Sequence, residues 1–134
     1  MSSSPEPKIL FVDDDRYDML PHVEKLRSVG FEVTTAIEVE DAVALLARGL
    51  KPDLIIADLI MRTSFEEAVD SAHSAGVRFC KVVREGLRLR CPILVLSVLS
   101  EPAIQASVRP YAELVLNKPI LPNQLVRYVR EALS

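Results

Sequence analysis

The sequence is poor in the residue types that mark several classes of protein. Among its 134 residues there is no tryptophan, and there are only two cysteines and four glycines. Two cysteines cannot build a disulfide framework, and Cys80 and Cys91 lack the C-x-x-C or Cys/His spacing of a zinc site. We therefore expect both to be reduced, partly buried thiols.

Long apolar runs and an excess of basic residues are also missing. No segment approaches the roughly 20 apolar residues that a membrane span needs. Residues 1–7, "MSSSPEP", read as a flexible leader without the apolar centre of a signal peptide. With a net charge of −3 and no basic stripe, direct nucleic-acid binding is not expected. The sequence thus predicts a cytoplasmic protein that binds neither membranes nor nucleic acids.

Hydrophobic residues make up 49 % of the chain, enough for the core of one domain, which we place at 8–134. Short apolar or β-branched runs alternate with amphipathic segments five times. This alternation predicts a parallel sheet with helices on both faces, a three-layer α/β/α sandwich. The usual order for five such units is the flavodoxin-like 2-1-3-4-5. The expected strands are 8–12, 31–36, 53–58, 92–97 and 113–119, and the expected helices are 18–29, 38–49, 76–86, 101–108 and 122–134.

Proline and glycine suggest where the helices begin and end. Pro21 predicts that the first helix starts close to it, since proline is tolerated in a first turn. Leu20, Val23 and Leu26 would form its apolar stripe. Gly30 and Gly49 would close the first two helices.

The segment 63–75 reads as an additional helix. Ser64 and Glu67 fit a capping box, and apolar residues follow at helical spacing. Gly76 would then begin the next helix. The alternative is one long helix that continues through Gly76, at a cost of about 1 kcal/mol for the glycine.

Polar side chains follow four of the expected strands. Asp13 and Asp14 come after the first strand and Asp58 ends the third, whereas Ser97 and Lys118 follow the last two. The carboxyl ends of parallel strands meet at one edge of a sheet, so these side chains should converge. Clustered carboxylates are the oxygen ligands that Mg²⁺ prefers, and the sequence therefore predicts a magnesium site there. Asp15 is interpreted as a helix N-cap or a solvated acid of the first turn.

The motifs "ILFVDDD", "KPDLIIADLIM", "PILVLS" and "NKPI", in this order, resemble those of response-regulator receiver domains over residues 8–133. The resemblance implies that Asp58 is the phosphoacceptor and that Lys118 pairs with the phosphoryl group. It makes Ser97 the switch hydroxyl and Lys118–Pro119 a cis peptide. For Mg²⁺ it implies direct binding by Asp14, mainly water-mediated binding by Asp13, and contributions from Asp58 and the backbone carbonyl of Ile60.

The implied function is a signalling switch that is phosphorylated by a sensor histidine kinase or a phosphotransfer protein. Such a chain promotes only its own phosphorylation and dephosphorylation and is not otherwise an enzyme. Output would pass by contact, through a homodimer or an output protein at helix 4, strand 5 and helix 5. The alternative is an interaction module that works without phosphorylation. An enzyme on the same fold is disfavoured, because neither a glycine-rich phosphate loop nor a nucleophile elbow is present.

The sequence departs from the usual receiver pattern at several positions. Arg62 stands where proline is usual, and Val115 replaces an aromatic residue, so the usual aromatic rotation cannot operate. Val98 is bulkier than the usual alanine or glycine and should narrow the approach to Asp58. His22 and His73 have no paired motif and are interpreted as surface residues.

Overall fold

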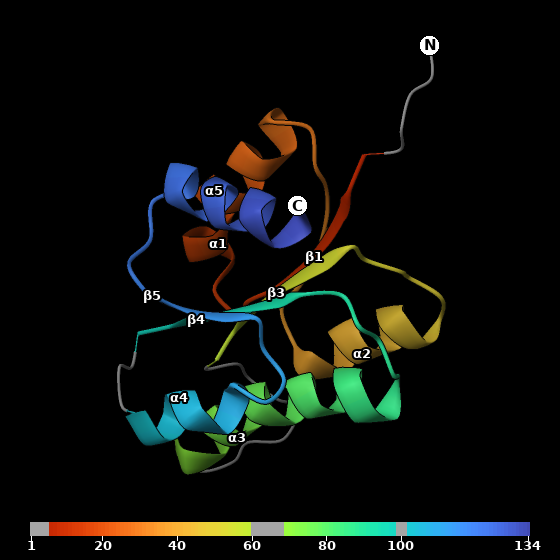
Figure 1. Ribbon diagram of the computed structural model, residues 1–134, viewed down its shortest axis with the longest axis vertical. Coiled ribbons are helices and arrows are strands. Elements are labelled where there is room, and N and C mark those ends of the chain that lie inside the picture. The colour runs from red at the N-terminus through yellow and green to blue at the C-terminus, as the bar shows by residue number, and fades with distance from the viewer. Residues whose placement is uncertain (1–5, 60–68, 99–101) are drawn as a thin grey trace.

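The structure is a computed structural model that describes residues 6–59, 69–98 and 102–134, without the side chains of 69–74 and 104. Its five strands form one parallel sheet of order β2-β1-β3-β4-β5, which confirms the predicted topology (Figure 1). The strands are β1 Lys8–Val12, β2 Glu32–Ala36, β3 Leu54–Asp58, β4 Ile93–Ser97 and β5 Leu114–Asn117. The helices are α1 Arg16–Ser28, α2 Val39–Ala47, α3 Val69–Lys81, α4 Pro102–Val108 and α5 Pro122–Leu133, with a π-helical turn, Val82–Gly86, after α3.

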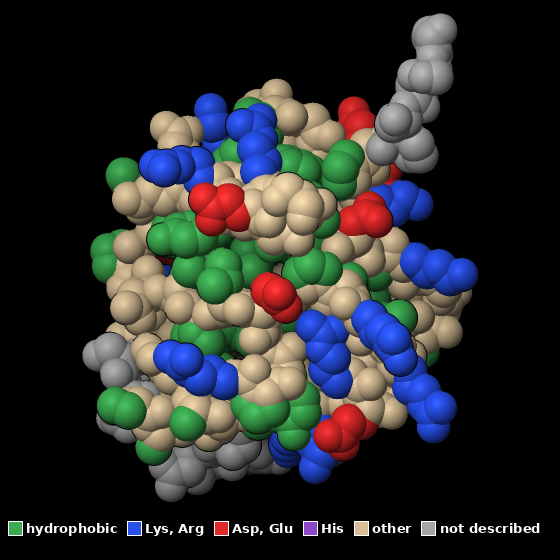
Figure 2. Space-filling model, in the orientation of Figure 1, with side chains coloured by type: hydrophobic (Ala, Val, Ile, Leu, Met, Phe, Trp, Pro, Cys, Tyr) green, Lys and Arg blue, Asp and Glu red, His purple; other side chains and the backbone are tan. Residues whose placement is uncertain are grey.

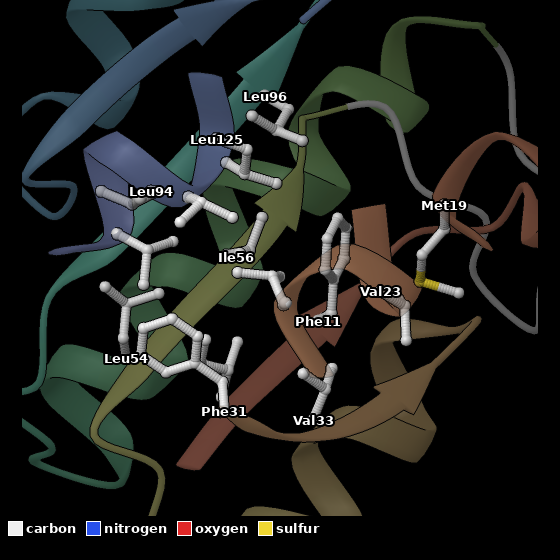
Figure 3. Close-up of a cluster of buried hydrophobic side chains, with 14 of the residues drawn as sticks. Phe11, Met19, Val23, Phe31, Val33, Leu54, Ile56, Leu94, Leu96 and Leu125 are labelled. Atoms are coloured by element: carbon white, nitrogen blue, oxygen red, sulfur yellow. The ribbon is translucent and has the colours of Figure 1, made fainter. Parts of the chain in front are cut away.

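Two hydrophobic cores lie on opposite faces of the sheet, because successive strand residues point to opposite sides. Ile9 and Phe11 of β1 pack beneath α1 and α5, as Figure 3 shows for Phe11. Leu10 and Val12 face the layer of α2, α3 and α4. These four residues of β1 are at most 1 % exposed. The sandwich therefore has the three predicted layers (Figure 1).

Helix α1 begins earlier than the position of Pro21 suggested. Asp15 is its N-cap, as anticipated: the Asp15 carboxylate accepts from the backbone N–H of Asp18 at 3.0 Å. Pro21 lies inside the helix rather than in its first turn. The expected apolar stripe is also partly wrong, because Leu20 is 49 % exposed and Met19 is buried instead. The N-cap at Asp15 thus outweighs the proline in setting the start of α1.

Gly76 lies within α3 and does not begin a new helix. The helix runs unbroken from Val69 to Lys81, which supports the alternative of one helix through the glycine; residues 63–68 of the predicted extra helix lie outside the described part. A Cβ atom at Gly76 would collide with the carbonyl oxygen of Leu59 and lie 2.9 Å from its carbonyl carbon. The glycine therefore allows α3 to pack directly on the backbone that follows β3.

The ends of α1 and α2 are those predicted from glycine. Gly30 has a φ of +105° and Gly49 a φ of +114°, conformations that residues with a Cβ rarely adopt. No helix in the described parts of the chain is long and apolar enough to cross a membrane.

Candidate functional site

The carboxyl edge of the sheet collects the acidic residues that follow β1 and β3. Asp13 comes directly after β1, and its backbone N–H donates to the carbonyl of Ala36 at 3.0 Å. One oxygen of its carboxylate accepts from the backbone N–H of Asp15 at 2.9 Å. Asp58 is the last residue of β3. Asp13 is 1 % and Asp58 8 % exposed, so both carboxylates are held largely out of water.

Asp13, Asp14 and Asp58 form a cluster suited to a divalent cation. Each offers a carboxylate oxygen, and these atoms lie within 4.8 Å of one another. Holding three negative charges together, two of them buried, is unfavourable unless positive charge compensates them. Hard, oxygen-only donors of this kind match the ligand preference of Mg²⁺. The chemistry of the donor set therefore fits the metal that the sequence predicted.

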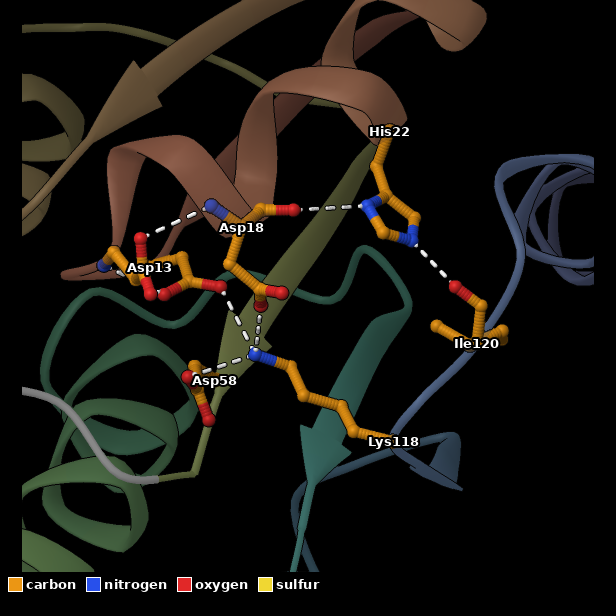
Figure 4. Close-up of polar contacts among 7 residues, drawn as sticks. Asp13, Asp18, His22, Asp58, Lys118 and Ile120 are labelled. Atoms are coloured by element: carbon orange, nitrogen blue, oxygen red, sulfur yellow. Dashed lines mark hydrogen bonds and ion pairs between the residues drawn. The ribbon is translucent and has the colours of Figure 1, made fainter.

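Lys118 provides positive charge at this edge. Its Nζ lies 2.8 Å from Asp18, 3.1 Å from Asp58 and 3.2 Å from Asp13, in each case from Oδ2 (Figure 4). Burial alone would lower the pKa of Lys118. The hydrogen bond to Asp18 and the charges of Asp58 and Asp13 outweigh burial and raise that pKa, so the ammonium form is strongly favoured.

Two further residues, Asp18 and His22, join the site and were missed by the sequence interpretation. Both lie on α1, one helical turn apart. His22 Nε2 lies 2.6 Å from the carbonyl oxygen of Ile120, in the loop after β5, and its Nδ1 lies 3.2 Å from that of Asp18 (Figure 4). The only signal in the sequence was the spacing of four residues between Asp18 and His22, which places both on one face of α1.

Comparison with known proteins identifies the fold that carries this edge. No protein-family model and no curated protein matches the chain, but solved structures do. The chemotaxis response regulator CheY4 of Vibrio cholerae is 28 % identical, with a TM-score of 0.79 over 96 % of this chain and 99 % of that one. The chain has the receiver-domain fold of response regulators.

Two more structures show how widely this fold is shared. The N-terminal domain of a response regulator/sensory box/GGDEF protein from Carboxydothermus hydrogenoformans is 26 % identical, with a TM-score of 0.76 over 94 % of this chain and 93 % of that one. A CheY-like receiver-domain protein from Methanospirillum hungatei is 19 % identical, with a TM-score of 0.80 over 96 % and 94 %. At 19 % identity the likeness concerns the fold alone.

The other predicted residues of the receiver site lie where the strand order places them. Ser97 ends β4 and is fully buried, and its carbonyl accepts from the backbone N–H of Lys118 at 2.8 Å. The Lys118–Pro119 peptide is cis, as the resemblance implied. Ile60, named for its carbonyl, lies outside the described residues.

An open cavity of about 500 Å³ lies over the acidic edge of the sheet. Asp14, Asp58 and Lys118 line it, together with Val98. Val98 is 62 % exposed, so the side chain that was expected to narrow the approach to Asp58 stands at the mouth of this cavity. The carboxylates of the cavity are therefore reached from solvent beside an apolar side chain.

Val115, which replaces the usual aromatic residue of receiver domains, is built into β5. It pairs with Val95 of β4 and is half-buried against the core beneath α3 and α4. A β-branched side chain has few χ1 rotamers, which restricts the movement of the Val115 side chain.

Proposed function

We propose that the chain is a signalling domain that accepts a phosphoryl group on Asp58 from a phosphohistidine, in a reaction that depends on Mg²⁺. The observation that carries the proposal is the position of Asp58. Its carboxylate is nearly buried, lies 3.1 Å from the Lys118 ammonium, and shares a cluster of ligand atoms within 4.8 Å with Asp13 and Asp14. A buried acid with a cation and two further acids beside it suits phosphoryl transfer better than a structural role.

The residues of the site have distinct tasks in this transfer. A carboxylate oxygen of Asp58 forms the new P–O bond as the P–N bond of the phosphohistidine breaks, and the departing imidazole takes up a proton. Lys118 is placed to donate to an oxygen of the transferred group, whose negative charge it offsets. Asp13, Asp14 and Asp58 would hold Mg²⁺, which when bound neutralises charge on the phosphoryl oxygens.

The donor would be a sensor histidine kinase or a phosphotransfer protein, and output would pass through protein contacts. The face of β5 and α5 suits such contacts, because Leu121 is 65 % and Tyr128 37 % exposed there. A hollow of about 350 Å³ lies between β5 and α5, and its lining contains Arg127, Tyr128 and Glu131. Hydrophobic side chains gather below α5 on the face drawn in Figure 2, with charged side chains around them.

The proposal is tested by intact mass measurement after incubation with Mg²⁺ and acetyl phosphate. The wild-type chain should gain one phosphoryl group, and Asp58→Asn should gain none. Lys118→Ala should be labelled about 10²-fold more slowly, because it loses a charged donor aimed at the reacting group. EDTA should abolish labelling of the wild type.

Asp53→Asn is the matched control, since Asp53 precedes the opposite end of β3, where its carboxylate accepts from the backbone N–H of Lys8 at 2.7 Å. This variant should be labelled as fast as the wild type. Undiminished labelling of Asp58→Asn would refute the assignment of Asp58. A wild-type chain that takes no phosphoryl group would favour the alternative function, an interaction module that does not depend on phosphorylation.

A further inference from the structure

Lys118 has no spare donor. An ammonium group carries three N–H donors, and the Nζ of Lys118 lies within hydrogen-bond distance of three separate carboxylates, those of Asp13, Asp18 and Asp58. To donate to a phosphoryl oxygen, Lys118 has to release at least one of them. Which carboxylate it releases therefore affects how readily the site accepts a phosphoryl group.

The three carboxylates differ in what phosphorylation would do to them. Asp58 would itself carry the phosphoryl group, and Asp13 belongs to the cluster that fits a cation. Asp18 has neither of these roles, yet it makes the shortest contact with Nζ, at 2.8 Å. Its side chain is 48 % exposed, so water can solvate the Asp18 carboxylate once Lys118 leaves. Asp18 is thus the closest of the three partners and the least costly to release.

The contact between Asp18 and Lys118 is held in place by a second contact between the same two elements. One turn further along α1, His22 meets the carbonyl oxygen of Ile120 at 2.6 Å, two residues after Lys118. Asp18 and His22 therefore contact the loop after β5 on both sides of Pro119 (Figure 4). This two-point attachment keeps the Lys118 side chain beside α1.

We propose that Asp18 is a positioning residue of the phosphorylation site: it holds Lys118 in the unphosphorylated chain and competes for it with the phosphoryl group on Asp58. The inference rests on the proposed function and adds a residue that sets the affinity of the site. Exposed ion pairs contribute up to about 1 kcal/mol, and a competitor of that strength weakens binding by a factor of about three to five.

Beryllofluoride, a phosphoryl mimic, serves as the probe, and calorimetric titration in Mg²⁺ gives its dissociation constant. Asp18→Asn should bind it about three- to fivefold more tightly than the wild type. Asp15→Asn is the matched control: it removes the same charge from the same cavity and keeps a good N-cap residue, and the contacts of Nζ do not involve Asp15. This control should change the constant less than twofold. Asp18→Glu, which retains a carboxylate within reach of Lys118, should restore the wild-type value.

The possible outcomes separate this inference from the proposed function. In the first outcome, the wild type and Asp15→Asn bind the probe, and Asp18→Asn binds it no more tightly than the wild type does. The proposed function then stands, but the proposed competition by Asp18 is wrong. Competition is equally wrong if Asp18→Glu behaves like Asp18→Asn. If the wild type does not bind beryllofluoride at all, the proposed function fails and the competition fails with it. Thermal unfolding of each variant shows whether the fold is retained.

Discussion

Cys80 and Cys91 differ in burial and should therefore differ in reactivity. Burial raises the pKa of the Cys80 thiol to about 12, against a weaker opposing effect of Arg84, and burial also raises the pKa of the half-buried Cys91. Alkylation requires the thiolate, so in the native chain at about pH 8 Cys91 should react with iodoacetamide and Cys80 should react only on unfolding. Cys91→Ser should therefore remove native labelling, as measured by mass spectrometry. If Cys80→Ser and Cys91→Ser were labelled equally in the native state, Cys91 would not be the more reactive thiol and the prediction would be wrong.

The raised pKa of Cys80 also has a consequence for stability. An acid whose pKa is raised in the folded state stabilises the fold fully at pH values below its pKa in the unfolded chain, here 9.0. That contribution declines as the pH rises from 9.0 toward about 12, because the unfolded chain ionises first. Cys80→Ala should accordingly lessen the fall in the free energy of unfolding above pH 9.0. A fall as steep as that of the wild type would exclude Cys80 as its source.

Lys118 illustrates which contacts of a single residue can be predicted from the sequence. Its proximity to Asp13 and Asp58 follows from strand order, because all three residues stand at carboxyl ends of a parallel sheet. Its contact with Asp18 does not, since it joins residues 100 positions apart and depends on how α1 is rotated above the sheet. The same holds for His22, which was interpreted as a surface residue: it is half-buried, and its ring meets a carbonyl 98 positions away.

At the scale of the elements, the strands were predicted well and the helix boundaries less well. A strand buried on both faces is a continuous apolar run, and this pattern leaves little choice of position. Pro21 and Gly76 were both interpreted as boundaries from local preference, yet both lie inside helices. For Gly76 the reason is tertiary: α3 packs against the backbone of Leu59, which no local pattern reveals.

Gly76→Ala should destabilise the protein even though alanine favours helices. The added Cβ would collide with the Leu59 backbone, and overpacking of this kind costs about 1–3 kcal/mol. The gain in helix propensity is at most about 1 kcal/mol. Urea denaturation should show a lower midpoint with an unchanged slope. Because Leu59 follows Asp58, phosphorylation by acetyl phosphate should slow as well.

Gly86→Ala is the control for this prediction. A Cβ at Gly86 would lie 3.6 Å from the Cγ1 atom of Val82, an ordinary van der Waals distance. Its stability should match or slightly exceed that of the wild type. A Gly76→Ala variant as stable as Gly86→Ala would show that α3 does not require close approach to Leu59.

At the scale of the whole molecule, the sheet topology brings the residues of the candidate site together. The order β2-β1-β3-β4-β5 brings residues 13, 58 and 118 to one edge, although they come from three separate β-α units. This could be predicted from the sequence, because alternating elements with short connections allow few topologies.

Locating the phosphoryl group on the chain is the sharpest test of the role proposed for Asp58. After incubation with Mg²⁺ and acetyl phosphate, borohydride reduces an aspartyl phosphate to homoserine, which peptide sequencing by mass spectrometry can assign. We predict homoserine at position 58 in the wild type, and at no position when Mg²⁺ is withheld. Homoserine at position 13 or 14, or a phosphoryl group retained on His22, would contradict the assignment.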